Sequence, residues 1–270
     1  MALSVLNNIA SIAAQNQLSI TSAGLQRTLF RLASGSRINS GADDAAGLAI
    51  ADGLRANISA LNQSARNAND GIGNLQVADG AFGQVSNLLN RAVTLATQSA
   101  TGTVSASQRT ALNAEYTSIK DEIDRIGSNT TFNGTSVFSA STTSIFLSDG
   151  GSNSTITTTV GTLSSTGLSL AADITTVVNA TTALGEINTA ISTVASNRGT
   201  VGAVINRLNA AINVINSQVQ NLTFAEDGIR AADIAKEVAN LTRFSILNQT
   251  GISALSQANN QQQQVLALLR

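Results

Sequence analysis

Apolar residues recur along most of this chain at alternating spacings of four and three. This spacing is typical of a coiled-coil helix with a left-handed supercoil. The first such seam consists of Leu54, Ile58, Leu61, Ala65, Ala68, Ile72 and Leu75. After Asp79 the row resumes at Phe82 and shifts gradually as far as the segment 101–103, Thr-Gly-Thr. Because glycine is a poor helix former, we expect the helix to end there.

Two further seams follow the first. The second covers 112–126, and the short glycine-containing link before it makes it antiparallel to the first. The third and longest covers 184–229 and is interrupted only by Arg198 and Glu226. It can lie along both earlier seams, so the pattern predicts a bundle of long helices. Gly127 is expected to close the second helix as its C′ residue.

The two ends of the chain carry narrower apolar faces. Residues 3–32 form one such helix, and a shifted frame from 234 to 255 forms the other. Asn, Gln and Ser flank both faces. Since an isolated helix draws most of its stability from tertiary packing, each end needs a partner. We therefore expect the two ends of the chain to lie together and pair.

The helical pattern is interrupted between residues 34 and 44. Ser34-Gly35-Ser36 ends the first helix, and Asn39-Ser40-Gly41 is a turn. Asp43-Asp44 places carboxylates near the positive N-terminal end of the next helix. Gly35 and Gly41 are expected to adopt backbone conformations that residues with a Cβ adopt poorly. Gly228 marks a similar joint before the last helix.

The residues around this interruption resemble a known family. The strings RLASG (31–35), RINS (37–40) and DDAAGLAI (43–50) are similar to the N-terminal signature of bacterial flagellin, the filament subunit. Phe132-Asn133-Gly134 and the final VLALLR (265–270) extend the resemblance to the whole chain. Larger flagellins carry long variable outer domains, which this chain lacks. The resemblance implies a short-form flagellin.

The segment from about 129 to 182 differs in character, being rich in Ser, Thr, Gly and β-branched residues. Asn133-Gly134 and Asp149-Gly150 are hairpin signals, and two short strands are expected near 144–147 and 154–160. A disordered linker rich in Ser and Thr is the alternative. The predicted fold is therefore mainly α: an elongated antiparallel helical hairpin and coiled-coil bundle with a small β-hairpin excursion at its tip.

The resemblance also implies a division into domains. Residues 1–42 together with 231–270 would form a terminal coiled-coil domain that lines an inner tube. Residues 43–230 would form a helical rod domain in an outer tube, with the β-rich excursion at about 129–182 on its surface.

The composition excludes most kinds of catalytic and metal-binding site. Among 270 residues there is no His and no Cys, which closes off Ser-His-Asp and Cys-His catalysis, structural zinc and haem ligation. Asp43 with Asp44 or Asp52, and Glu122 with Asp124, could form carboxylate pairs, but a solvated or capping role is expected. We expect no enzyme, no cofactor and no metal. The net charge of −1 gives no case for nucleic acid or a membrane surface.

Three groups of candidate functional residues follow. For terminal self-assembly they are Leu3, Leu6, Leu25, Leu29, Leu32, Ile252, Leu255, Leu266, Leu268 and Leu269. For the joint between domains they are Ser34, Gly35, Arg37, Asn39, Gly41, Asp43 and Asp44. By resemblance to flagellins that a host Toll-like receptor detects, Arg91, Leu95 and Glu115 form a candidate receptor contact, with Arg91 and Leu95 on one helix face.

The function implied is a structural subunit that self-assembles into the bacterial flagellar filament for motility. No secretory signal or membrane span is expected, because no Lys or Arg precedes Arg27 and no long apolar block occurs. By itself this favours the cytoplasm, whereas the resemblance implies type III export and a secreted, extracellular filament. Implied partners are further copies, the export apparatus and its chaperone, the filament cap and hook-filament junction proteins. Alternatives are a chemoreceptor-type signalling coiled coil and a hook-filament junction protein.

Overall fold

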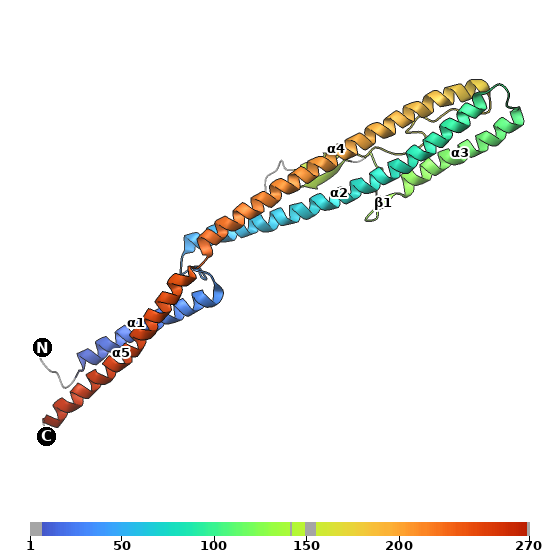
Figure 1. The fold of residues 1–270 in the computed structure, drawn as a ribbon. Coiled ribbons are helices and arrows are strands. Elements are labelled where there is room, and N and C mark those ends of the chain that lie inside the picture. Colours follow the sequence, from blue (N-terminus) through green and yellow to red (C-terminus); the bar gives the residue numbers. More distant parts are fainter. Residues whose placement is uncertain (1–6, 141, 149–154, 269–270) are drawn as a thin grey trace. The chain divides into compact units, whose positions relative to one another are not determined.

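The chain folds almost entirely into long helices. The computed structural model describes residues 7–140, 142–148 and 155–268. Its helices are α1 (Ile9–Ser34), α2 (Ala45–Ala100), α3 (Ala106–Asn129), α4 (Val177–Arg230) and α5 (Ile234–Leu268), as Figure 1 shows. The predicted mainly α fold is confirmed. At about 1.5 Å per residue, the 54 residues of α4 extend over roughly 80 Å.

The chain divides into two compact units. The terminal unit comprises residues 1–56 and 221–270, and the core unit comprises residues 57–220. Helices α2 and α4 contribute residues to both. The domain boundaries expected after residues 42 and 230 remain a prediction.

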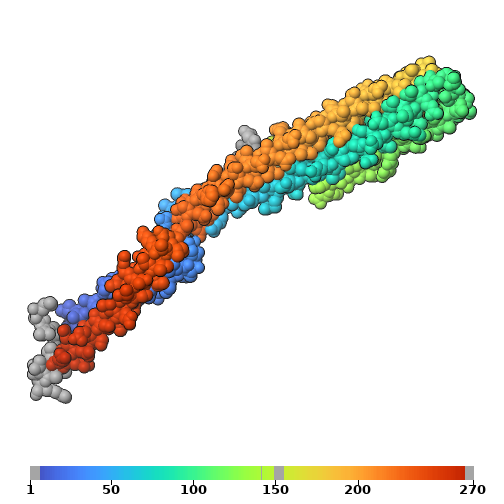
Figure 2. Space-filling model, viewed as in Figure 1, coloured from blue at the N-terminus to red at the C-terminus, as the bar shows by residue number. Residues whose placement is uncertain are grey.

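In the terminal unit, α1 and α5 pair in antiparallel orientation (Figure 2). Near one end, Asn8 Nδ2 donates to the carbonyl oxygen of Ala258 at 3.0 Å. Further along, Asn248 Nδ2 donates to Ser22 Oγ at 2.9 Å. The helices approach closely because glycine faces a large side chain. A Cβ on Gly24 would lie 2.8 Å from the ring of Phe244.

In the core unit, α2, α3 and α4 enclose a continuous apolar core. Ring atoms of Phe82 and Phe138 meet edge to face with centroids 5.1 Å apart. An ion pair between Arg198 and Asp79, 2.8 Å long, links α4 to α2. The fully buried seam positions include Leu75, Val85, Leu89, Ile123, Ile187, Val194 and Leu208. The predicted seams therefore form the core of this unit.

A buried arginine closes the turn between α2 and α3. Arg109 donates from Nε, Nη1 and Nη2 to the carbonyl oxygens of Ser99, Val104 and Thr101, at 2.7–2.8 Å. These carbonyls lie at or just beyond the end of α2, where no further helical turn can satisfy them. Ser105 and Gln108 form a capping box that starts α3.

Two short hairpins interrupt the helices. Strands β1 (Thr131–Phe132) and β2 (Thr135–Ser136) pair antiparallel across Asn133-Gly134, whose φ angles are 50° and 76°. Positive φ at both positions is the signature of a type I′ turn, so this hairpin signal is confirmed. Strands β3 (Thr143–Phe146) and β4 (Thr155–Thr158) also pair antiparallel. The second signal, Asp149-Gly150, lies outside the described residues.

The second hairpin packs along the side of α2 and not at the α2–α3 turn. Ser64 Oγ donates to the carbonyl oxygen of Ser148 at 3.0 Å, and Asn67 Nδ2 donates to that of Phe146 at 3.3 Å. Ile145 occupies the space that a Cβ on Gly71 would need. The excursion therefore contributes Ile145 to the core.

Three expected boundaries are wrong by a few residues. Helix α3 continues past Gly127 to Asn129, and Gly127 is buried where the carbonyl of Leu163 leaves no room for a Cβ. Gly127 therefore allows the backbone of Leu163 to approach α3 closely, and it does not end the helix. Helix α4 begins at Val177, inside the segment assigned to the excursion, and runs through Gly228 to Arg230. The joint therefore follows Arg230.

Candidate assembly surface

The paired terminal helices leave large apolar side chains uncovered. On α1 the fully buried residues are Thr21 and Thr28, whereas Ile9 is 71% exposed and Phe30 is 68% exposed. The other exposed large apolar residues of these two helices are Ile12, Ile20, Leu29, Ile234, Val238, Ile246, Leu247 and Ile252. We call these ten residues the uncovered surface. Burying one such side chain fully contributes about 1.5–3 kcal/mol, so this surface favours a covering partner.

Helix α1 carries two apolar rows. The row at 18, 21, 25, 28 and 32 faces α5 and is buried or half-buried. A second row, offset by two positions, contains Ile9, Ile12, Ile20 and Phe30 and is exposed. Because α5 covers only the first row, the second row stays exposed in the single chain and is available to other helices.

Some of the predicted terminal residues pack between α1 and α5, and others are exposed on the surface of the pair. Leu25, Leu32 and Leu255 are half-buried between α1 and α5, whereas Leu29 and Ile252 are exposed. Leu3, Leu6 and Leu269 lie outside the described residues, as do the side chains of Leu266 and Leu268. Sequence reasoning missed Ile9, Ile12, Ile20 and Phe30. The offset second row was the signal that could have identified them.

The helix segments that carry most of this surface have no charge. Residues 7–26 of the first helix and 244–264 of the last contain no Asp, Glu, Lys or Arg. Neutral groups connect them instead, as when Ser11 Oγ donates to Asn259 Oδ1 at 2.9 Å. Copies of these segments can therefore approach without charge repulsion.

At the joint, the segment after α1 pairs with the linker before α5. The backbone N–H of Arg37 donates to the carbonyl of Arg230 at 2.7 Å, and that of Ala232 donates to the carbonyl of Gly35 at 3.0 Å. Gly35 ends α1 with φ +68°, as expected. The expectation for Gly41 is wrong, because its φ is not in the left-handed region and a Cβ would have room.

The two carboxylates of the joint act as caps. Asp44 Oδ1 accepts from the backbone N–H of Gly47 at 2.9 Å, which starts α2. Asp43 Oδ2 accepts from the backbone N–H groups of Asn39 and Ser40 at 3.2 and 3.1 Å. These bonds, that from Asn39 foremost, lower the pKa of Asp43 below its usual value. Ser34 accepts from Asn39 Nδ2 at 2.9 Å, which closes the loop.

Arg31 connects α1 to both the joint and α5. Its guanidinium lies 3.4 Å from Glu237 Oε1 and 3.8 Å from Asp43 Oδ1. Among the described residues, Arg31 Nε and Glu237 Oε2 are buried without a hydrogen-bond partner. Glu237 is the buried acid of this unit and was not identified from the sequence, because its partner is 206 positions away.

The structure brings two of the three candidate receptor residues together. Arg91 and Glu115 are exposed and form an ion pair 2.7 Å long between α2 and α3. Leu95 is 1% exposed and packs in the core. The expectation that it shares an exposed face with Arg91 is therefore wrong. A receptor role for the exposed pair stays a prediction.

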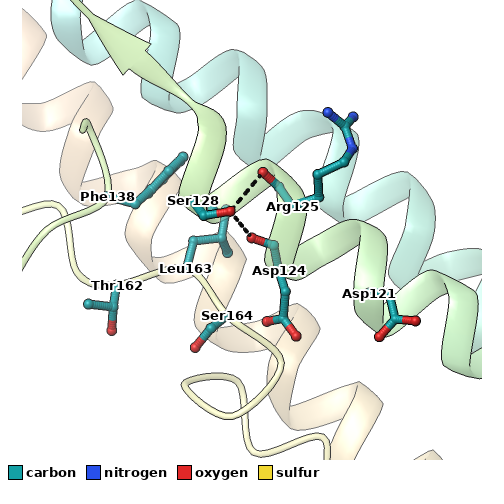
Figure 3. A pocket seen from close by; sticks show the side chains of 9 residues that line it. Asp121, Asp124, Arg125, Ser128, Phe138, Thr162, Leu163 and Ser164 are labelled. Carbon is teal, nitrogen blue, oxygen red and sulfur yellow. Dashed lines mark hydrogen bonds between the residues drawn. The ribbon is translucent and has the colours of Figure 1, made fainter. Parts of the chain in front are cut away.

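A hollow of about 640 Å³ lies between α3 and the loop before α4 (Figure 3). Of its carboxylates, Asp124 accepts from the backbone N–H and Oγ of Ser165 at 2.7 and 2.8 Å. Neighbouring Glu122 pairs with Arg125 at 2.6 Å. Asp124 therefore holds the loop before α4, and Glu122 is paired with a cation. Earlier on α3, burial raises the pKa of Tyr116 to about 12.

The described part of the chain holds no group of three or more His, Cys, Asp or Glu side chains placed to bind a metal ion. None of its described helices is both long and apolar enough to cross a membrane.

Comparison with known proteins identifies the family. Residues 5–143 match the bacterial flagellin N-terminal helical region, and residues 184–269 match the bacterial flagellin C-terminal helical region. A flagellin of Halalkalibacterium halodurans is 38% identical over 268 residues, which cover 98% of each chain. A flagellar filament core protein of Treponema phagedenis is 33% identical, with 98% of this chain and 99% of that protein covered.

A solved structure agrees with these matches. The crystal structure of Bacillus cereus flagellin is similar with a TM-score of 0.50 and 32% identity, covering 60% of this chain and 94% of that chain. The signalling coiled coil and the hook-filament junction protein receive no support from these relatives. The chain belongs to the bacterial flagellin family.

Proposed function

We propose that this protein is the structural subunit of a bacterial flagellar filament and that its uncovered surface drives assembly. The observation that carries the proposal is the second apolar row on α1, which a single chain cannot cover. Relatives similar along nearly the whole chain are named as flagellins and filament core proteins. Flagellins are structural proteins, so we assign no enzymatic activity.

Assembly follows from the packing of identical uncharged helices. Each α1 and α5 pair presents apolar side chains that neighbouring pairs can cover in turn. The terminal domain, residues 1–42 with 231–270, would then line an inner tube, and residues 43–230 would form the outer tube. Low charge in 7–26 and 244–264 supports this arrangement, because many copies converge there.

The joint residues are proposed to set the angle between these two layers. Support comes from Gly35 in the left-handed region and from Asn39, Asp43 and Asp44, which bond to groups of the segment 34–47. Arg37 donates from Nη2 to the carbonyl oxygen of Ile229 near the end of α4. All of these hydrogen bonds form within one chain, so the joint can be fixed before assembly. Ser34 contributes by accepting from Asn39.

Membership of the family supports the remaining partners. Type III export with a chaperone would deliver the chain to an extracellular filament, between hook-filament junction proteins and a filament cap. For a host Toll-like receptor, the exposed Arg91 and Glu115 are the proposed contact. Without an exposed Leu95 beside them, recognition should be weak. A receptor reporter assay in which Arg91→Ala changes nothing would remove this site from the proposal.

Electron microscopy of the purified full chain after salting out tests the filament function. We expect tubes from the unmodified protein and none from Ile20→Ser, which places a hydroxyl in the uncovered row. Val178→Ser is the matched control, because Val178 is at least as exposed as Ile20, at 73% against 60%, but lies at the start of α4 in the core unit. If the unmodified protein forms no ordered polymer, or if only the control abolishes tubes, the proposal is wrong.

A further inference from the structure

The turn between β1 and β2 contains the Asn-Gly pair of this chain. Asn133 and Gly134 form the complete two-residue loop, with φ angles of 50° and 76°. Both residues are exposed. The sequence contains no second Asn-Gly pair. The loop therefore combines a distinctive dipeptide with access to water.

The reacting groups of this pair are not engaged. Among the described residues, no hydrogen bond occupies the side-chain amide of Asn133, and the backbone N–H of Gly134 lies outside the β1–β2 ladder. Gly134 has no Cβ to hinder the approach of its nitrogen to the preceding side chain. A Cβ built there would meet nothing within 4 Å, so the surroundings are open as well.

We propose that Asn133 is a self-modification site that deamidates without an enzyme. The Gly134 nitrogen gives its proton to solvent base and forms a bond to Cγ of Asn133. The bond from Cγ to Nδ2 breaks, and Nδ2 leaves as ammonia after taking up a proton. Water then opens the cyclic imide at either carbonyl, which yields aspartate or isoaspartate. One water is consumed and one ammonia is released, with no oxidation.

The chain supplies an internal comparison at Asn39-Ser40. There the Asn39 amide donates to Ser34 Oγ and to the carbonyl of Ser36, at 2.9 and 3.0 Å. The Ser40 N–H, which would have to attack, donates to Asp43 Oδ2 at 3.1 Å. Breaking these bonds must precede reaction. The joint is therefore protected while the hairpin is not.

Isoaspartate would disrupt the hairpin in a defined way. It inserts one additional carbon into the main chain of a loop that has only two residues. The ladder is short, pairing Phe132 with Thr135 and Thr131 with Ser136. The Phe132 ring lies 3.5 Å from the Cβ position of Gly73 on α2, and this contact would be lost. The disruption of the hairpin should not extend beyond Val137, which is buried and donates its backbone N–H to the carbonyl of Thr130.

Peptide mapping by mass spectrometry tests the proposal on the full-length protein, held folded at mildly alkaline pH. We expect aspartate plus isoaspartate to form at Asn133 at least about tenfold faster than at Asn39. The reason is that hydrogen bonds hold the reacting groups at Asn39 and not those at Asn133. Equal rates at the two positions would overturn the proposal.

Two variants sharpen the test. Asn133→Gly keeps a residue that tolerates positive φ and removes the reacting amide, so early ammonia release should fall to background. Undiminished early release would overturn the proposal. Asp43→Ala frees the Ser40 N–H and should raise the rate at Asn39 while Asn133 is unchanged. No rise at Asn39 would show that hydrogen bonding is not what separates the two sites.

Discussion

In the core unit, Phe82, Leu89 and Ile187 are at most 1% exposed, whereas in the terminal unit Ile9 and Phe30 are 71% and 68% exposed. Both units are built from amphipathic helices with few charges. The core unit, however, has three helices and a returning loop, so each apolar row finds a neighbour. The terminal unit has only α1 and α5 as long partners, and one row of each remains open.

This difference separates two kinds of stability. The core unit buries its side chains within one chain, so its free energy of unfolding should not depend on protein concentration. In the proposed assembly, other copies would cover the exposed apolar side chains of the terminal unit, so its stability should rise with concentration by mass action. The same helical pattern thus gives a folded core in one unit and an exposed apolar surface, proposed for polymerisation, in the other.

Removing residues 252–270 should produce the largest difference in behaviour between the terminal unit and the core unit. The truncation leaves residues 9–17 of α1 without their partner on α5 and deletes Ile252. We predict complete loss of assembly, measured by electron microscopy and sedimentation, while the melting temperature of the core unit is unchanged. Tubes formed by the truncated chain would show that the core unit assembles without the ends.

Exchanging one phenylalanine in each unit should separate stability from assembly. Phe82→Ala removes a ring packed against Phe138 and should cost about 3–5 kcal/mol, a Tm drop of roughly 10 °C. Phe30→Ala, at an exposed position, should leave the Tm of the free subunit almost unchanged yet weaken assembly. Calorimetry and a critical-concentration measurement check the two effects. A large Tm drop in Phe30→Ala would place that ring in a covered site of the single chain.

The joint glycines should differ from each other. Gly35→Ala forces a Cβ into the left-handed region and should destabilise the terminal unit by about 1–2 kcal/mol. Gly41→Ala is the matched control and should be nearly neutral, because its φ is ordinary and the space is open. Chemical denaturation of assembled filaments measures both. Equal destabilisation by the two variants would contradict the proposed difference in backbone conformation.

Acid should protonate Asp43 at the joint before it protonates Asp173, which lies just before α4. The folded-state pKa of Asp43 is lowered, so its stabilisation is complete above about pH 3.8 and is lost as pH falls through the lower folded value. Asp173, bonded to Asn179 and Thr175 in the core unit, has a pKa of about 2 and stays ionised longer. NMR titration of the two carboxyl groups checks the order. Asp43→Asn should abolish the earlier step only, and titration of Asp173 first would contradict the expected order.

Much of this fold follows from the sequence alone. Spacings of three and four predict which side of each helix is apolar, and these seams form the core around Leu75, Tyr116 and Leu208. Asn133-Gly134 predicts its own turn because two consecutive positive φ angles favour these residue types. Gly35 likewise ends α1 for a local reason. These features depend on residues close together in the chain.

Only the tertiary structure decided which neighbour meets each face. Periodicity places Leu95 one turn from Arg91, but the packing of α2 against its neighbours buries Leu95 and leaves Arg91 exposed. The sequence suggests that Gly127 ends a helix, whereas in the structure it is a glycine because the carbonyl of Leu163 leaves no room for a Cβ. Both rows of α1 carry large apolar residues, yet α5 covers only the one that also contains Thr21 and Thr28. A helical pattern specifies directions around its own axis, whereas burial depends on segments far along the chain or on other copies.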